Sequence, residues 1–413
     1  MGESRGGLGR RELLRRGTAA ALGAAFLGLE RAHASATEEP QRIRRYRKLG
    51  KTGLEVSDIC FGSDAMANPK LVQYALDRGV TYFDTAESYP MNGPGRAESA
   101  IGRGIAGRRD EVVIGTKTVA ASTARREQLM EHLEASLQRL QTDRVDIYFN
   151  HAVNDPDRLR NPEWDEFVAA AKRQGKIRFV GMSGHGGRLI ECLDLALDEN
   201  KVDVILAAHN FGSDPAFYER FTKSFDIVAN QQGLPRVLAK ARERGVGVLV
   251  MKTLMGARLN DMRPYERADA TFSQAAFRWV FSQPHVDALV ISMNRRSQID
   301  EYLAASGQTE VRPSDARLLR GYVAANTSTH CRPGCGECEG ACPEGVPIAD
   351  VLRARMYAMD YGEMEQGRAT YAQLGAGASA CAGCAHRACL GVCPHRLEIP
   401  ELASRAHDVL ARS

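Results

Sequence analysis

The sequence of 413 residues lacks two features that would each place it in a different class of protein. After the first 40 residues it has no apolar run near the ~20 residues that span a bilayer. It also has no large excess of charge: the formal net charge is +4, and residues 1–34 account for +3 with six arginines against three glutamates. A nucleic-acid-binding protein would carry a basic body or stripe. We therefore expect no stable membrane span after residue 40 and no nucleic-acid partner.

The first 34 residues have the composition of an export signal. They contain RRELL over 10–14, the weakly apolar stretch GTAAALGAAFLGL over 17–29 and the small-residue site AHA over 32–34. A basic start, a short apolar segment and such a site are typical of a secretory signal. Paired arginines favour the twin-arginine route. We predict a twin-arginine signal peptide over 1–34, the twin-arginine export machinery as a partner and a periplasmic or extracytoplasmic location. The alternative is a disordered basic arm.

From Tyr46 to about Ser306, short β-branched runs alternate with amphipathic helical stretches. Eight runs are strand candidates: 58–61, 81–83, 112–116, 146–150, 177–182, 202–207, 248–251 and 288–291. Helical stretches between them include 126–140, 162–173, 234–244 and 273–281. Eight such units indicate an α/β fold, the (β/α)8 TIM barrel. A doubly wound sheet is the alternative, but CFGSDAM after the first strand is not a glycine-rich phosphate turn.

The strand–helix alternation stops after residue 310, which divides the chain. We assign 46–310 to the barrel and 311–413 to a small, mainly helical domain with two cysteine groups joined by a helical stretch over 348–374. Within the barrel, the long connection 212–233 follows the sixth strand. Such a loop lies on the active-site face of a barrel, so it is either substrate-lining or an ordinary surface excursion.

Side chains with acid–base chemistry follow three consecutive strand candidates. Asp84 and Tyr89 follow the second, Lys117 ends the third and His151 follows the fourth, so all four should meet at the carboxyl end of a barrel. A phenol with a pKa near 10 is a weak acid at neutral pH. We expect Lys117 to lower the pKa of Tyr89, the general acid, and Asp84 to keep the ammonium charged. His151 should hydrogen-bond the substrate oxygen.

These residues stand in segments that resemble the aldo-keto reductases over about 46–306. The segments are YRKLGKTGLEVSDICFG, FDTAESY, AESAIGRGI, GTKT, DIYFNH and KIRFVGMS. The resemblance implies an oxidoreductase that uses NADP(H) on the carbonyl of an aldehyde, ketone or sugar. Hydride goes to the carbonyl carbon while Tyr89 protonates the oxygen.

Six residues are candidates for contacts to the cofactor: Ser183, Asn210, Arg295, Arg296, Gln298 and Glu301. Four match positions of the family, and the two arginines suit a ribose 2′-phosphate, which favours NADP over NAD. The same arginines fit equally well as solvated residues at a helix start. Two family features are missing, because Leu206 replaces a glutamine and no aromatic residue in 249–252 can stack on the nicotinamide.

Eight of the ten cysteines form two quartets near the C-terminus, which are the candidate metal ligands: Cys331, Cys335, Cys338, Cys342, Cys381, Cys384, Cys389 and Cys393. Each quartet ends C-x3-C-P, as the bacterial ferredoxin run does. Zinc sites usually separate two C-x2-C pairs by a longer gap, and disulfides between such close neighbours would be strained. Iron–sulfur clusters are therefore favoured, with zinc and disulfides as the alternatives.

The paired quartets resemble the ferredoxin-like tail that one branch of the aldo-keto reductases carries. That resemblance implies two 4Fe–4S clusters with crossed ligation: Cys331, Cys335 and Cys338 with Cys393, and Cys381, Cys384 and Cys389 with Cys342. Both quartets have one extra residue relative to the usual spacing, so His330, His386 or His395 are alternative ligands.

Two functions remain open from the sequence. The first is an exported aldo-keto reductase that acts on a small carbonyl substrate, and the second is an electron-transfer protein whose barrel binds a ligand or partner without nicotinamide turnover. The second requires a redox partner protein. A purely structural role for the clusters is a further alternative.

Overall fold

The computed structural model of the chain describes residues 41–64, 68–90, 92–185, 188–213, 233–254, 262–263, 266–267, 270–326, 331, 337–360, 364–374 and 378–411. The predicted signal peptide, residues 214–232 of the long connection, Cys335 and His330 lie outside these ranges. None of the helices within them is long and apolar enough to cross a membrane.

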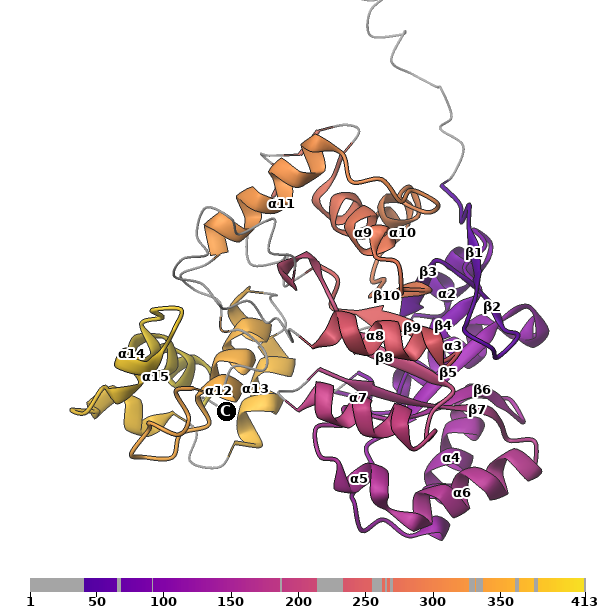
Figure 1. The fold of residues 1–413 in the computed structure, drawn as a ribbon, viewed down its shortest axis with the longest axis horizontal. Coiled ribbons are helices and arrows are strands. Elements are labelled where there is room, and N and C mark those ends of the chain that lie inside the picture. Colours follow the sequence, from indigo (N-terminus) through magenta and orange to yellow (C-terminus); the bar gives the residue numbers. More distant parts are fainter. Residues whose placement is uncertain are drawn as a thin grey trace, which may run out of the picture. The chain divides into compact units, whose positions relative to one another are not determined.

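Eight parallel strands close into a barrel in chain order, with the last strand pairing back onto the first (Figure 1). The strands are β3 (Ile59–Gly62), β4 (Tyr82–Asp84), β5 (Val113–Thr118), β6 (Val145–Asn150), β7 (Ile177–Gly184), β8 (Val204–Ala208), β9 (Gly247–Met251) and β10 (Ala288–Ser292). All eight predicted strands are present, shifted by no more than a few residues. Closure confirms the TIM barrel and rules out the doubly wound sheet.

Helices cover the outside of the barrel (Figure 1). They are α2 (Pro69–Leu76), α3 (Arg96–Gly104), α4 (Arg126–Leu140), α5 (Asp157–Arg160), α6 (Pro162–Arg173), α7 (Leu189–Asp198), α8 (Leu234–Glu243), α9 (Phe272–Ser282), α10 (Arg296–Leu303) and α11 (Pro313–Asn326), with single 3-10 turns at η1 (Arg109–Glu111) and η2 (Phe211–Ser213). The start of α6 shows why such predictions succeed: Asn161 caps the helix by accepting from the Glu163 N–H at 3.0 Å, and Pro162 occupies the first turn.

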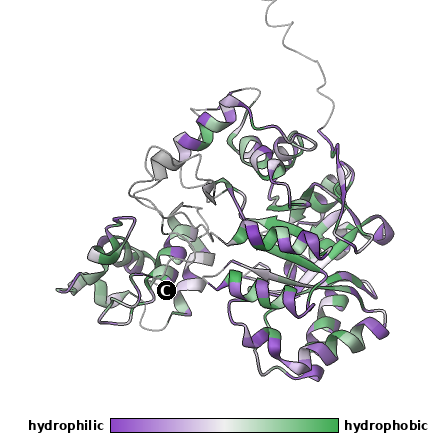
Figure 2. Cartoon of the chain, in the orientation of Figure 1, coloured by the Kyte–Doolittle hydropathy of each residue, from purple (hydrophilic) through white to green (hydrophobic). Residues whose placement is uncertain are grey.

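The strands are buried on both faces, which is why they are predominantly hydrophobic in Figure 2. On β9, Leu249 points into the barrel interior, whereas Val248 and Val250 pack against the surrounding helices. This alternation follows from the two-residue period of a strand.

A hairpin that the sequence analysis did not predict precedes the barrel. Strands β1 (Tyr46–Lys48) and β2 (Glu55–Ser57) pair antiparallel. Leu49 in their turn is fully buried in the barrel interior and contacts the backbone of Gly247, where a β-carbon would come within 2.6 Å of the leucine. The hairpin therefore fills the amino-terminal end of the barrel and leaves the carboxyl end for the site.

The barrel core extends past residue 310, so the predicted domain boundary is too early. Tyr322 of α11 belongs to the same hydrophobic cluster as the barrel helices. Asp315 of α11 is fully buried and receives two hydrogen bonds from Arg278 of α9, at 2.7 and 2.5 Å. An acidic residue in a polar stretch gives no sequence signal of such a buried partner, which is why the boundary differs.

The C-terminal segment has a hydrophobic cluster of its own. Its helices are α12 (Ile348–Arg355), the π-helical turn η6 (Met356–Asp360), α13 (Met364–Ala372), the 3-10 turn η7 (Ser379–Gly383), α14 (Ala388–Val392) and α15 (Ile399–Leu410). The predicted helical stretch over 348–374 is therefore not one regular helix. Apolar periodicity does not distinguish an α-helical turn from the wider π turn that follows α12.

Candidate active site

Three consecutive strands bring the predicted catalytic side chains to the carboxyl end of the barrel. Asp84 is the last residue of β4, Lys117 is the penultimate residue of β5, and His151 directly follows β6. Tyr89 lies in the loop after β4. The register sets the strand ends side by side, because Asp84 is paired with Gly115, two residues before Lys117. The contacts below show that the four side chains form one site.

Lys117 and Asp84 form a buried ion pair. Their side chains are only 1% and 6% exposed. The Lys117 ammonium donates to the Asp84 carboxylate and, at 2.6 Å, to the carbonyl of Thr85. Burial lowers the pKa of Lys117 and raises the pKa of Asp84, and the attraction between the two charges opposes both shifts. The pair thus holds a lysine ammonium in a site that is almost closed to solvent.

Tyr89 and His151 make the second contact of the site. The Tyr89 hydroxyl lies 3.3 Å from Nε2 of His151, and the two rings meet edge to face at a centroid distance of 5.5 Å. Burial, followed by the positive charges of Lys117 and Arg158, lowers the pKa of His151 to about 3. The imidazole is therefore neutral at neutral pH, so it can hydrogen-bond a phenol or a substrate oxygen without bringing a charge.

The effect of Lys117 on Tyr89 differs from the prediction. The ammonium lies 5.4 Å from the centre of the Tyr89 ring, but its hydrogen bonds go to Asp84 and Thr85. Burial raises the pKa of Tyr89 well above its usual value, and the carboxylates of Asp84 and Asp64 add to the rise. The phenol therefore keeps its proton in this arrangement.

Glu87 supports the loop that carries Tyr89, a role the sequence analysis missed. One carboxylate oxygen of Glu87 accepts from the Thr118 hydroxyl at 2.6 Å, and the other lies 2.8 Å from Nδ1 of His132 on α4. The backbone N–H of Glu87 also donates to the carbonyl of Lys117 at 3.2 Å. Glu87 lies inside the FDTAESY segment, but its partners are 31 and 45 residues away, so no local pattern could reveal them.

Ser183 and Asn210, two of the cofactor candidates, stand at the ends of β7 and β8. Ser183 is paired in register with Leu206, and its hydroxyl accepts from the Ala152 N–H at 3.0 Å. The Asn210 side chain accepts from the Gly212 N–H at 3.0 Å and donates to the carbonyl of Lys252 at 3.2 Å. Both side chains thus order the loops at the carboxyl end of the barrel.

The other four candidates belong to α10 or its N-cap: Arg295, Arg296, Gln298 and Glu301. The two arginine side chains are exposed. Gln298 is nearly buried; its amide oxygen accepts from the Asn294 N–H at 2.8 Å and its amide nitrogen donates to the Tyr302 hydroxyl at 2.7 Å. The structure thus separates these four residues from Ser183 and Asn210 along the strand ends.

Several buried polar atoms at this end of the barrel have no hydrogen-bond partner among the residues that the structure describes. They include Nδ1 of His151, Nδ1 of His209, Oγ1 of Thr253 and Oδ1 of Asn294. These residues follow β6, β8, β9 and β10. Buried polar groups are normally satisfied. A line of unsatisfied donors and acceptors across four strand ends fits an elongated polar ligand, such as a nicotinamide dinucleotide.

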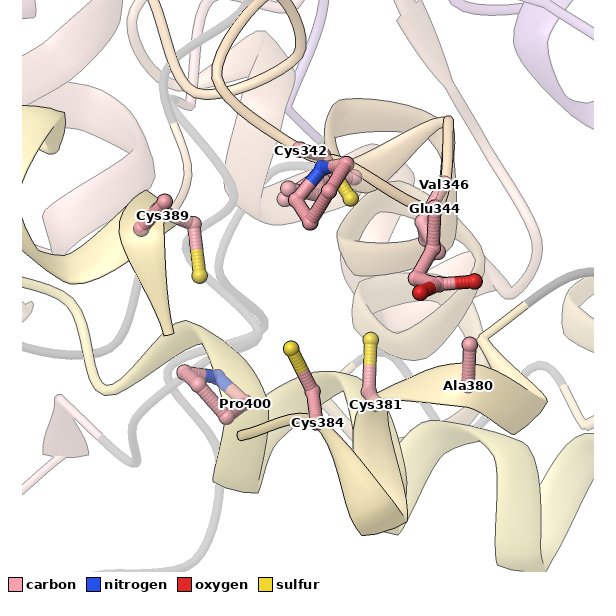
Figure 3. A pocket seen from close by; sticks show the side chains of 11 residues that line it. Cys342, Glu344, Val346, Ala380, Cys381, Cys384, Cys389 and Pro400 are labelled. Carbon is pink, nitrogen blue, oxygen red and sulfur yellow. The ribbon is translucent and has the colours of Figure 1, made fainter. Parts of the chain in front are cut away.

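Four cysteines of the C-terminal segment surround one small pocket (Figure 3). Cys342 comes from the first quartet, whereas Cys381, Cys384 and Cys389 come from the second, which is the set that crossed ligation requires for one cluster. Their thiols form no disulfide. Burial, and then the facing sulfurs of Cys342, Cys389 and Cys384, raise the pKa of Cys381 to about 11. Four cysteine sulfurs that face one pocket are a donor set that suits a metal cluster.

The second predicted set is described only in part. Cys338 and Cys393 are buried and Cys331 is half-buried, all in the C-terminal hydrophobic cluster. Of the alternative ligands, His395 is buried and His386 is exposed. Among the described residues, no three histidine, cysteine or acidic side chains are placed to hold a single metal ion. A cubane cluster spreads its four thiolates farther apart than one ion does, because each sulfur binds a different iron.

Comparison with known proteins identifies the barrel. Residues 62–267 match the Aldo/keto reductase family. The barrel is an aldo/keto reductase domain. The uncharacterized oxidoreductase YrpG of Bacillus subtilis is 29% identical over 240 residues, which cover 52% of this chain and 68% of that protein. L-glyceraldehyde 3-phosphate reductase of Escherichia coli K12 is 25% identical over 305 residues, covering 63% and 87%.

Solved structures agree with this assignment. An aldo-keto reductase structure from Pseudomonas aeruginosa is 26% identical, with a TM-score of 0.50, and covers 68% of this chain and 98% of that one. The fold also matches an aldo-keto reductase from Bacillus halodurans in its holo form, with a TM-score of 0.52 at 19% identity, covering 67% and 96%. The aldo/keto reductase domain makes the protein an oxidoreductase.

Proposed function

We propose that the protein is an exported aldo-keto reductase that uses NADP(H) to reduce the carbonyl of an aldehyde, ketone or sugar, or to oxidise the corresponding alcohol. The observation that carries this proposal is the buried Lys117–Asp84 pair beside the Tyr89–His151 contact, at the carboxyl end of an aldo/keto reductase domain. Two relatives, named L-glyceraldehyde 3-phosphate reductase and L-galactose dehydrogenase, support a sugar-like carbonyl as the substrate class.

Reduction adds a hydride to the carbonyl carbon and a proton to the carbonyl oxygen. When bound, NADPH supplies the hydride that forms the new C–H bond. The Tyr89 hydroxyl gives its proton to the carbonyl oxygen, and neutral His151 hydrogen-bonds that oxygen and orients it. The Lys117 ammonium stabilises the phenolate left on Tyr89, while Asp84 keeps that buried ammonium protonated.

Substitution of Tyr89 tests this assignment. Tyr89→Phe should lower kcat by at least about a hundredfold, because a positioned acid contributes roughly 10²–10⁴-fold. Tyr46→Phe is the matched control, because Tyr46 is 41% exposed on the hairpin at the opposite end of the barrel. Equal activity in Tyr89→Phe and the wild type would refute the role of Tyr89 as the acid.

The proposed cofactor contacts are Ser183, Asn210, Gln298 and Glu301, with Arg295 and Arg296 on the 2′-phosphate. The exposed guanidinium groups at the start of α10 support a preference for NADP, because guanidinium pairs well with phosphate oxygens. Fluorescence titration should give tighter binding of NADPH than of NADH, and Arg295→Gln with Arg296→Gln should remove the difference. Lys70→Gln, an exposed change on α2, is the control.

We further propose a ferredoxin-like domain in the C-terminal segment that binds two 4Fe–4S clusters. The four thiols around one pocket support this (Figure 3). Iron and sulfide counted on anaerobically purified protein should approach two cubane clusters. Cys389→Ala should reduce both counts, whereas Cys192→Ala, a change to a buried cysteine of the barrel, should leave them unchanged. Zinc in place of iron would contradict the proposal.

Export by the twin-arginine route would be consistent with bound clusters, because that route carries folded proteins, whose clusters are inserted before export. We propose a signal peptide over 1–34 and a periplasmic or other extracytoplasmic location, with the twin-arginine machinery as a partner. Arg10→Lys with Arg11→Lys should retain the protein in the cytoplasm, as measured by fractionation. Unchanged export of this variant would refute the route.

A second candidate function is electron transfer without nicotinamide turnover. Two departures from the family favour it: Leu206 stands where a glutamine was expected, and 249–252 contains no aromatic residue that could stack on the nicotinamide. It predicts reversible reduction of the clusters by a redox partner protein, no binding of NADPH and no carbonyl turned over. Tight NADPH binding would exclude it.

A further inference from the structure

A lysine with a constrained backbone stands at the carboxyl end of β9. Lys252 directly follows the strand, and its φ of +59° lies in the left-handed region, which is uncommon for a residue with a side chain. Asn210 donates to the Lys252 carbonyl at 3.2 Å, and the His209 N–H donates to the Met251 carbonyl at 3.0 Å. The end of β8 therefore determines how Lys252 leaves its strand.

The Lys252 ammonium has no carboxylate partner among the described residues. Five lysines there are buried or half-buried: Lys117, Lys176, Lys201, Lys240 and Lys252. The other four each form an ion pair with an aspartate or glutamate. A partly buried charge without a counter-charge is unfavourable. Strained residues are often found at functional sites, and this one offers a cation to a ligand.

The surroundings of Lys252 are those of an anion site. His151 and His185 are both neutral, because burial and then nearby positive charges, Lys252 among them, lower their pKa values. No carboxylate contributes to either shift. The next residue, Thr253, is fully buried and its hydroxyl has no hydrogen-bond partner among the described residues. A cation, a free hydroxyl and a neutral imidazole together suit an oxyanion.

We propose that Lys252 binds an anionic group of the carbonyl substrate, so that the site selects carbonyl compounds that carry a phosphate or a carboxylate. This rests on the proposed carbonyl reduction. Tyr89 and His151 hold the carbonyl oxygen, and Lys252 acts on the second group as a point charge, as lysine does with phosphate. Lys252 could instead bind a phosphate of the cofactor. The test below distinguishes this ligand from an anionic group of the substrate.

The test compares charged and neutral carbonyls of matched size. Glyceraldehyde 3-phosphate against glyceraldehyde probes phosphate, and glyoxylate against glycolaldehyde probes carboxylate. Lys252→Met should lower kcat/KM for the charged member of the selected pair about 10- to 100-fold, which is the loss expected for one hydrogen bond to a charged group. The neutral member should change less than about twofold, and Lys252→Arg should restore much of the loss. Lys70→Met, exposed on α2, is the control.

A binding measurement without turnover tests the anion site at Lys252 independently of carbonyl reduction. Titration calorimetry with inorganic phosphate and with glycolate should detect binding of one of them to the wild type and to Lys70→Met but not to Lys252→Met. Equal anion binding by wild type and Lys252→Met would overturn the proposal, as would equal losses for charged and neutral carbonyls. If Lys252→Met binds NADPH more weakly but still discriminates between charged and neutral carbonyls as the wild type does, Lys252 binds a phosphate of the cofactor instead, and the proposal is wrong. Anion binding that depends on Lys252, without reduction of any carbonyl, would refute the proposed reaction alone.

Discussion

Replacing Asp84 with asparagine should leave Lys117 as a buried charge without a counter-ion. The two side chains are 6% and 1% exposed, so water cannot take the place of the lost carboxylate. Asparagine keeps the shape of the side chain and the oxygen that accepts from the Tyr82 hydroxyl, but it replaces the oxygen that accepts from the Lys117 ammonium with an uncharged NH2 donor. Breaking a buried ion pair in this way costs about 3–5 kcal/mol, and we expect that loss in the free energy of unfolding at neutral pH.

The loss should depend on pH with a definite sign. In the variant, burial without a counter-charge holds the pKa of Lys117 below its unfolded value of about 10.4. The unfolded chain then binds more protons than the folded protein, so stability rises with pH. Between the folded and the unfolded pKa the slope should approach ~1.4 kcal/mol per pH unit. Urea unfolding followed by tryptophan fluorescence, repeated from about pH 7 to pH 10, measures both quantities.

An exposed ion pair provides the control. Asp157 and Arg160 are 72% and 56% exposed, so Asp157→Asn should cost less than about 1 kcal/mol and show no comparable pH slope. An Asp84→Asn protein that loses less than about 1 kcal/mol, with stability independent of pH, would refute the reasoning.

Three further predictions concern other groups of the barrel. Because burial lowers the pKa of His151 to about 3 and raises that of Tyr89, kcat/KM should be level between about pH 5 and pH 8; an inflection from either group inside this range would contradict it. Arg278→Met leaves the buried carboxylate of Asp315 unpaired and should cost about 3–5 kcal/mol in urea unfolding, and a loss below about 1 kcal/mol would exclude the pair as a link between α9 and α11. Glu87→Ala releases the loop that carries Tyr89 and should lower kcat about tenfold with little change in KM; a rise in KM alone would indicate a binding role instead.

The fold could be predicted well from the sequence because its signals are local. Each strand is a short apolar run, and several helices are amphipathic segments, of which α2, α6 and α9 begin with a side-chain N-cap. The bounds of α4 and α6 agree to the residue with the predicted 126–140 and 162–173. The hairpin before the barrel was missed, because two strands of three residues leave almost no periodicity.

The candidate site was predictable in part, because strand ends of a barrel meet at one face. The sequence therefore indicated that Asp84, Lys117 and His151 would lie together, and the structure brings them together. It could not indicate that burial and the carboxylates of Asp84 and Asp64 raise the pKa of Tyr89, since burial and these distances depend on contacts across the fold. That Lys252 forms no ion pair with a described carboxylate is likewise visible only in three dimensions.

The most direct test is a single turnover with NADPH. Anaerobically purified protein with its clusters counted is loaded with one equivalent of NADPH and mixed with a panel of small aldehydes and ketones, and the nucleotide absorbance is followed. We expect at least one carbonyl to oxidise the bound NADPH in the wild type, whereas Tyr89→Phe binds NADPH equally well and retains it reduced. Full clusters with no NADPH bound, or equal oxidation rates in the two proteins, would contradict carbonyl reduction at Tyr89.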